Sequence, residues 1–224
     1  MHQTKIMLNL GCGSVRPKAW TNTDSSLNAN LQKIPFIGKP IAKLFNPVQY
    51  SESNFEYMNL NKTWKYKDNS VDVVYASHLF EHLSLNSTVI FLSEAFRCLK
   101  SGGVIRIVVP DLYKICKRYI HDYEHNSFNN ESTEFILWAI NMHREGQYGN
   151  PGMIKKMILE LQGYPHQHKY MYDEKSLTKR IQAHGFTNIL SMTYGKSEYL
   201  KDCIGDVEGT AESYLSVYIE AIKN

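Results

Sequence analysis

The stretch Leu8-Asn9-Leu10-Gly11-Cys12-Gly13 decides which fold we expect for this chain. It completes the apolar run Lys5–Leu10, whose length suits a short buried strand, and then turns at two glycines. Because glycine has no Cβ and tolerates positive φ, a Gly-x-Gly turn lets a ligand approach the backbone closely. A dinucleotide-binding fingerprint would need a third glycine where Arg16 stands, and the chain has no Gly-Lys-Ser/Thr phosphate loop. Taken alone, the turn is equally compatible with a ligand site and with a tight structural bend.

Composition points to one globular domain. The chain has 224 residues, of which 43% are hydrophobic and 21% charged, and its net charge is +3. Since no block of five like charges occurs, we expect no nucleic-acid partner. No apolar run approaches the roughly 18 residues that span a bilayer, so no membrane association is expected. Because the first strand is expected to begin almost at once, we expect no signal peptide. The four cysteines have neither metal-ligand nor CxxC spacing, which predicts reduced thiols in a cytoplasmic protein.

Strands and helices alternate along the rest of the chain. Further strands are expected at Trp20–Asp24, Phe55–Met58, Val71–Ala76, Val104–Val109, Phe186–Tyr194 and Ser213–Ala221. One helix is expected to carry Val89, Leu92, Phe96 and Leu99 on one face and to stop at Ser101-Gly102-Gly103. A second is expected from Leu112 to about Tyr123, after a cap at Asp111. Further helices are expected at about 132–144, at about 152–162, and between Asp173 and Gly185. This order predicts an open α/β sheet with parallel central strands.

Two insertions are expected within a single domain that spans residues 1–224. In the first, at about 28–50, Pro35, Pro40 and Pro47 exclude one continuous helix. We interpret it as a cover over the cleft or a homodimer contact, in preference to a membrane-surface element. The second, at about 125–170, is the segment we expect to select the substrate.

Asp24 is the next candidate, because ligands of open α/β sheets lie beyond the carboxyl ends of the strands. An ionised carboxylate at the end of the second strand can accept hydrogen bonds from two ribose hydroxyls. The alternative is that Asp24 caps a turn or helix, which Ser25-Ser26 behind it would support.

Five segments in order form a more specific pattern. They are LNLGCG, AWTNTD, MNLNKTW, NSVDVVYASHLFEHL and LKSGGVIRIVVPDL. The set resembles the class I S-adenosylmethionine-dependent methyltransferases, in particular the type 11-like group of small-molecule and glycan enzymes. The resemblance covers about residues 5–124 and resumes at HKYMYDEKSLTKRIQAHGF and the C-terminal strands.

The resemblance implies a Rossmann-like fold: a seven-stranded, mostly parallel sheet with an antiparallel C-terminal strand and helices on both faces. It also implies a cofactor, S-adenosyl-L-methionine, and the residues that bind it. These are Gly11, Cys12 and Gly13 under the methionine and ribose, Asp24 with Ser25 at the ribose hydroxyls, Asn59 and Leu60 at the adenine, and Ser77 beside the sulfonium. Only ten residues separate Gly13 from Asp24, so the usual first helix is expected to be short or absent.

A sulfonium methyl is already activated, so such an enzyme mainly has to align the acceptor and exclude water. An alcohol acceptor also has to lose a proton, which a positioned His, Asp or Glu can take. The candidates are His78, directly after the fourth strand, His168 and Asp111. A structural hydrogen bond is the alternative for His78, and a helix cap is the preferred reading of Asp111. His82 with Glu81 reads as a structural histidine.

Substrate contacts are expected from His143, His166, Tyr113 and Tyr170, because aromatic faces with polar tips suit sugars. His166 and His168 have the spacing of a metal pair, but no third ligand is evident nearby, and no metal is predicted. The leading hypothesis is an O-methyltransferase acting on a carbohydrate hydroxyl. The alternatives are a methyltransferase of another small metabolite (a phenol, amine or carboxylate) and a noncatalytic cofactor-binding protein.

Overall fold

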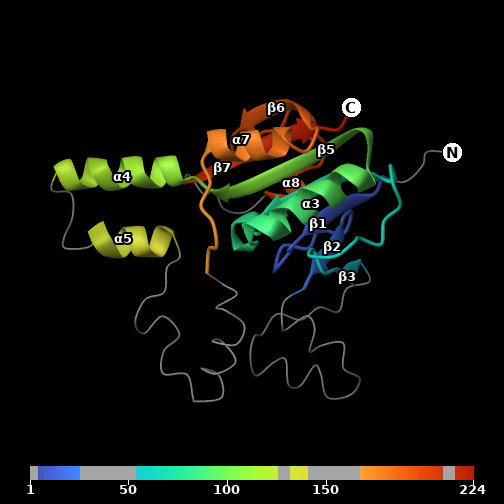
Figure 1. The fold of residues 1–224 in the computed structure, drawn as a ribbon, viewed down its shortest axis with the longest axis horizontal. Coiled ribbons are helices and arrows are strands. Elements are labelled where there is room, and N and C mark those ends of the chain that lie inside the picture. The colour runs from blue at the N-terminus through green and yellow to red at the C-terminus, as the bar shows by residue number, and fades with distance from the viewer. Residues whose placement is uncertain (1–4, 26–53, 126–131, 141–166, 209–214) are drawn as a thin grey trace, which may run out of the picture.

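The computed structural model describes residues 5–25, 54–125, 132–140, 167–208 and 215–224. They form one seven-stranded sheet with the strand order β3-β2-β1-β4-β5-β7-β6 (Figure 1). The strands are β1 (Met7–Leu10), β2 (Thr21–Asp24), β3 (Phe55–Tyr57), β4 (Val71–Ser77), β5 (Leu99–Pro110), β6 (Thr187–Met192) and β7 (Ser216–Ile222). All neighbouring pairs among the first five strands are parallel, and β7 runs antiparallel to both β5 and β6. The predicted mostly parallel sheet with an antiparallel C-terminal strand is confirmed.

Helices follow the strands in the predicted order. They are the short 3₁₀ helix η1 (Phe80–His82), α3 (Leu85–Cys98), α4 (Leu112–Glu124), α5 (Ser132–Ala139), α7 (Glu174–Gln182) and the single turn α8 (Ile204–Val207). Asp173 caps α7 as expected, by accepting a hydrogen bond from the Ser176 amide at 2.7 Å. Gly185, at φ +89°, follows the end of α7.

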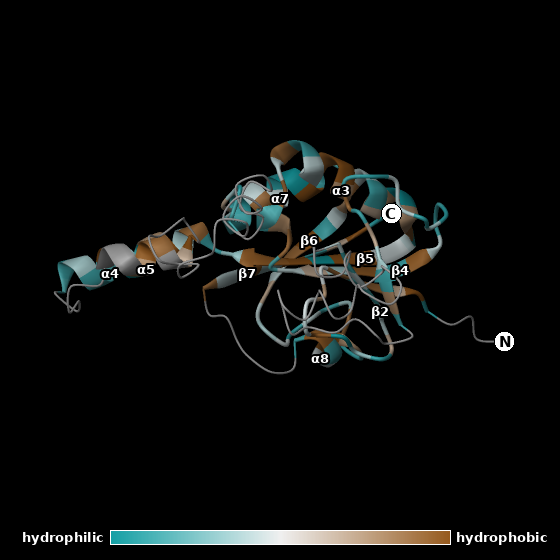
Figure 2. Ribbon diagram, turned by 90° about the horizontal axis from the view of Figure 1, so that it is seen from below, coloured by the Kyte–Doolittle hydropathy of each residue, from teal (hydrophilic) through white to brown (hydrophobic). Residues whose placement is uncertain are grey.

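The sheet is covered on both faces (Figure 2). Helices α3 and α7 lie over one face, where Phe91, Leu92, Leu177 and Ile181 pack on the buried strand residues. The segment around α8 covers the other face. There Ile204 and Val207 pack with Trp20 and with the buried side chains of β4 and β5 that point to this face. Because each central strand is buried on both sides, its sequence is nearly continuously apolar, as in VIRIVV.

The sequence-based interpretation of α3 is wrong in two respects. Its buried stripe consists of Thr88, Phe91, Leu92, Ala95 and Cys98. Val89, which was expected in the core, is 46% exposed. The helix also ends before the expected stop, because Leu99 already adopts extended geometry and pairs with Val71. Residues 101–103 therefore belong to β5 and do not terminate the helix.

A buried ion cluster sits in the middle of β5. The Arg106 side chain is fully buried and donates to both carboxylate oxygens of Glu208 at 2.7 Å and to Glu220 at 2.8 Å. Glu208 also accepts a hydrogen bond from the Gly195 amide, and Glu220 from the Glu198 amide. The cluster thus fixes the segment between β6 and α8 against the sheet.

Most of both expected insertions lies outside the described residues, and so does the helix expected at 152–162. Of the helix expected at 132–144, α5 accounts for residues 132–139. Within the described ranges, no helix combines the length and apolar character needed to cross a bilayer. All four cysteines are free thiols, and Cys12 and Cys98 are buried.

Candidate active site

The turn after β1 is shaped by two left-handed glycines, Gly11 at φ +64° and Gly13 at φ +50°. A Cβ at Gly11 would lie 2.9 Å from the Leu79 side chain, so no larger residue fits there. A Cβ at Gly13 would meet nothing within 4 Å, so the turn opens onto free space at this point. No helix forms among residues 11–20, which agrees with the short spacing to Asp24.

Backbone and amide contacts hold this turn against β2. The Cys12 amide donates to the Thr23 carbonyl at 2.9 Å. The buried Asn9 side chain donates to the Val15 carbonyl at 2.8 Å and to the Asn22 side chain at 2.9 Å. The Asn9 side chain therefore orders the loop from within.

The other predicted cofactor residues lie at or after the carboxyl ends of strands in the same half of the sheet. Asp24 ends β2 beside Tyr57, Ser25 follows it, and Ser77 ends β4. Asn59 accepts a hydrogen bond from the Asn61 amide at 2.9 Å. Leu60, which was expected against the adenine, is 6% exposed and packs in the core beneath α3.

His78 leaves β4 in a left-handed conformation, at φ +50°. This conformation is uncommon for residues with a side chain, and it tends to occur at functional sites. Nδ1 of His78 lies 3.3 Å from Oε1 of Glu81, and Nε2 lies 3.4 Å from the Ser216 hydroxyl. The side chain is 45% exposed, so one ring faces a carboxylate on one side and remains accessible on the other.

Glu81 stands at the centre of three histidines. Its side chain is fully buried in η1, and Oε1 lies 4.0 Å from Nε2 of His82 and 3.9 Å from Nε2 of His168. The amides of Lys169 and Tyr170 both donate to the Glu81 carbonyl, which brings His168 across 87 residues of sequence to this position. Burial lowers the pKa of His168 to about 4, so its ring is neutral at pH 7.

Glu81 was not predicted from the sequence to have a functional role. The only local signal was the His-x-x-Glu-His spacing itself, because the third histidine comes from a distant segment. His168 has no ring nitrogen directed at open space: Nε2 faces Glu81, and Nδ1 lies 3.3 Å from the Met171 sulfur. Of the two histidine candidates for the base, His78 has the more accessible ring.

Asp111 is the N-cap of α4, as the preferred interpretation held. Its side chain accepts hydrogen bonds from the amides of Tyr113 and Lys114 and is nearly buried. Tyr113, in the first turn of α4, is 65% exposed. The Tyr170 ring is tilted against that of Tyr172, with centroids 4.8 Å apart, and lies 5.6 Å from the Arg180 guanidinium. The two remaining substrate candidates, His143 and His166, lie outside the described residues.

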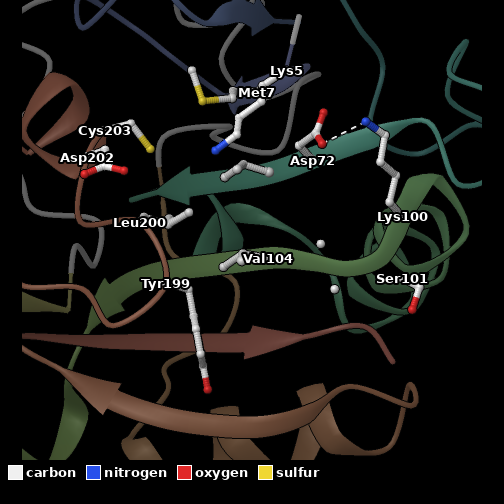
Figure 3. Close-up of a pocket in the computed structure, with 13 residues that line it drawn as sticks. Lys5, Met7, Asp72, Lys100, Ser101, Val104, Tyr199, Leu200, Asp202 and Cys203 are labelled. Carbon is white, nitrogen blue, oxygen red and sulfur yellow. Dashed lines mark hydrogen bonds and ion pairs between the residues drawn. The ribbon is translucent and has the colours of Figure 1, made fainter. Parts of the chain in front are cut away.

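A cavity of about 240 Å³ opens on the side of the sheet where the amino ends of the parallel strands lie, away from the residues described above (Figure 3). Met7, Val73 and Val104, which line it, lie toward the amino ends of β1, β4 and β5. Lys100 and Asp72 form an ion pair at 2.8 Å on one side of it. Since ligands of such sheets bind at the carboxyl ends of the strands, we place the active site at the other edge.

Comparison with known proteins shows which family model and which solved structures the chain resembles. Residues 8–107 match the family model described as a methyltransferase domain. The sheet order is that of the Rossmann-like fold, which solved methyltransferase structures share.

Solved structures share the fold at low sequence identity. A methyltransferase from Archaeoglobus fulgidus has a TM-score of 0.51 at 14% identity, over 99% of this chain and 87% of that chain. A possible histamine N-methyltransferase from Thermotoga maritima has a TM-score of 0.50 at 15% identity, over 100% and 84%. The chain covers 50% of another match, the CurJ carbon methyltransferase, at 13% identity and a TM-score of 0.46. No curated protein matches the chain.

Proposed function

We propose that the protein methylates a hydroxyl group of a small molecule, and that His78 is the general base. The observation that carries this proposal is the 3.3 Å approach of His78 Nδ1 to the buried carboxylate of Glu81. This approach is an ion-pair contact and not a hydrogen bond, and the negative charge of the carboxylate stabilises the imidazolium formed when Nε2 takes a proton. Nε2, which makes only a long contact to the Ser216 hydroxyl, is then available to the acceptor.

The cofactor fits the glycine turn. The free space at Gly13 and the positive φ at both glycines leave room for a ligand against the backbone, where Cys12 is held on β2. Asp24 and Ser25 would then hold the ribose hydroxyls, with Asn59 and Ser77 bordering the site. Bound there, S-adenosylmethionine supplies a methyl group on a neutral leaving group, and the chain's own residues align the acceptor and remove its proton.

Asp24→Ala tests this cofactor site. We expect the Kd for S-adenosylmethionine, measured by titration calorimetry, to rise about 10- to 100-fold, because charge-assisted hydrogen bonds contribute about 1.5–3 kcal/mol. Asp202→Ala at the opposite edge is the matched control and should leave the Kd unchanged. Equal affinities for Asp24→Ala and the unmodified protein would place the ribose elsewhere.

Carbohydrates are the acceptor class we propose. Tyr113 and Tyr170 present exposed rings with hydroxyl tips on segments that follow Asp111 and His168, near the carboxyl edge of the sheet. Such rings bind sugars by stacking and hydrogen bonding. The polar His143 and His166 belong to the proposed substrate segment at 125–170. The free thiols support the proposed cytoplasmic location.

A panel of acceptors with labelled methyl donor tests the substrate class. We expect label in sugar hydroxyls and little in phenols, amines or carboxylates. Turnover of one of those other groups would favour the alternative, a methyltransferase of another small metabolite. Tight cofactor binding without transfer to any acceptor would favour a noncatalytic protein.

A further inference from the structure

The side chains of Glu81, His82 and His168 converge close to His78. One ligand atom from each lies within 4.8 Å of the others. Glu81 and His82 come from η1, directly after β4, and His168 comes from the segment that crosses back before α7. We propose that these three residues bind a divalent first-row transition-metal ion.

The buried carboxylate is the first reason. Glu81 has no exposed side-chain surface, and neither of its carboxylate oxygens accepts a hydrogen bond from any residue that the structure describes. Its ion-pair contacts within those residues are to histidines alone. A buried carboxylate is costly unless a positive charge or hydrogen-bond donors compensate it. A metal cation between the side chains would provide that charge.

The orientation of the rings is the second reason. Nδ1 of His82 lies 3.2 Å from the Gln167 carbonyl, which can only accept, so the hydrogen is on Nδ1 and the Nε2 lone pair faces Glu81. A backbone carbonyl that orients a histidine in this way is the usual outer partner of a metal ligand. His168 also directs Nε2 at Glu81, at 3.9 Å from Oε1. Two imidazole nitrogens and a carboxylate therefore converge.

Distances favour a metal ion over a shared proton. The separations of 3.9 and 4.0 Å from Oε1 to the two Nε2 atoms are too long for hydrogen bonds. Ligands about 2.0–2.2 Å from one tetrahedral ion lie about 3.4 Å apart, so each imidazole has to approach the carboxylate by about half an ångström. Since all three ligand atoms lie within 4.8 Å of one another, no pair has to close by more than about 1.4 Å. Two imidazoles and one carboxylate suit Zn²⁺, Fe²⁺ or Co²⁺ better than Mg²⁺ or Ca²⁺.

Three protein ligands leave a coordination position free, as in catalytic metal sites. Glu81 also contacts His78 at 3.3 Å, so an ion held by the cluster would lie near the group that we propose as the base. An ion there would bind the acceptor oxygen and favour loss of its proton. This role rests on the proposed function, whereas metal binding itself does not. It also replaces the sequence-based expectation of no metal.

The test uses the full chain, stripped with a chelator and titrated with Co²⁺ while visible absorption is followed. We expect one equivalent to bind, with the spectrum of a low-coordinate nitrogen and oxygen site, and Zn²⁺ to displace it. His168→Ala and Glu81→Gln should weaken binding at least about 100-fold, since loss of an outer partner alone costs about 10- to 100-fold. His184→Ala, a histidine bonded to the Arg180 carbonyl, is the control and should bind as the unmodified protein does.

Several outcomes would overturn the proposal. These are a failure of the protein to take up stoichiometric Co²⁺ or Zn²⁺, binding of Mg²⁺ alone, and equally tight binding of the metal ion by all variants. Circular dichroism and cofactor titration of each variant confirm that it is folded, and His82→Ala provides a second ligand change. Methyl transfer by the stripped protein is measured in parallel. Metal uptake without methyl transfer would support the metal site and refute the proposed function. Undiminished methyl transfer without metal uptake would support methyl transfer and refute the metal site.

Discussion

Replacing His78 with alanine is expected to lower the turnover number about 10²- to 10⁴-fold, the contribution typical of a positioned general base. The Kd for S-adenosylmethionine should stay within about twofold, because in our proposal the ring contacts the acceptor and not the ribose. Initial rates with saturating cofactor and a calorimetric titration measure the two quantities. Free imidazole should restore part of the lost rate, which it would not do if the ring only supported the loop.

The matched control is His121→Ala, an exposed histidine on α4 whose nearest charged contact is Asp122. It should leave the turnover number unchanged. If His78→Ala retains more than a third of the normal rate, the proton is removed by another group. His168, Asp111 and solvent would then be the remaining candidates.

Arg106→Met should reduce the free energy of unfolding by about 3–5 kcal/mol, the usual result of removing one partner from a buried ion pair. The substitution leaves Glu208 and Glu220 with their carboxylates buried and without the guanidinium that compensates both. Urea denaturation, followed by circular dichroism, measures the loss. Lys100→Met removes a half-exposed ion pair with Asp72 and should cost less than about 1 kcal/mol.

A triple variant separates charge from packing in this cluster. Arg106→Met combined with Glu208→Gln and Glu220→Gln should recover most of the stability, because no uncompensated charge remains. If Arg106→Met alone is as stable as the unmodified protein, water or rearrangement solvates the carboxylates and the cluster does not hold the segment near α8.

The alternation of strands with helices and the parallel central strands could be predicted because they depend on local pattern, whereas the antiparallel C-terminal strand followed from the family resemblance. Apolar runs such as VDVVYA and VIRIVV, separated by glycine turns and amphipathic helices, indicate a covered parallel sheet wherever they occur. The position of Asp24 followed from the same pattern, since the ends of neighbouring strands meet at one edge. The limits of α3 did not, because pairing of Leu99 with Val71 overrides the helical periodicity.

The parts of the site that depend on long-range contacts could not be predicted. Glu81 and His82 read as ordinary residues of a loop until His168 is placed beside them through the backbone bonds from Lys169 and Tyr170. Arg106 likewise read as one residue of a strand, and its two carboxylate partners follow it by 102 and 114 residues. The left-handed backbone of His78 also has no signature in its neighbours.

The place of β7 between β5 and the edge strand β6 has a consequence for synthesis on the ribosome. Strand β6 pairs only with β7, and β7 is the last of the seven strands to be made. Until its residues emerge from the exit tunnel, β6 has no neighbour, and one edge of β5 stays open to unwanted association with other chains. The nascent polypeptide therefore completes its sheet abruptly and late, and translation arrest a few codons before Ser216 should yield a protease-sensitive product.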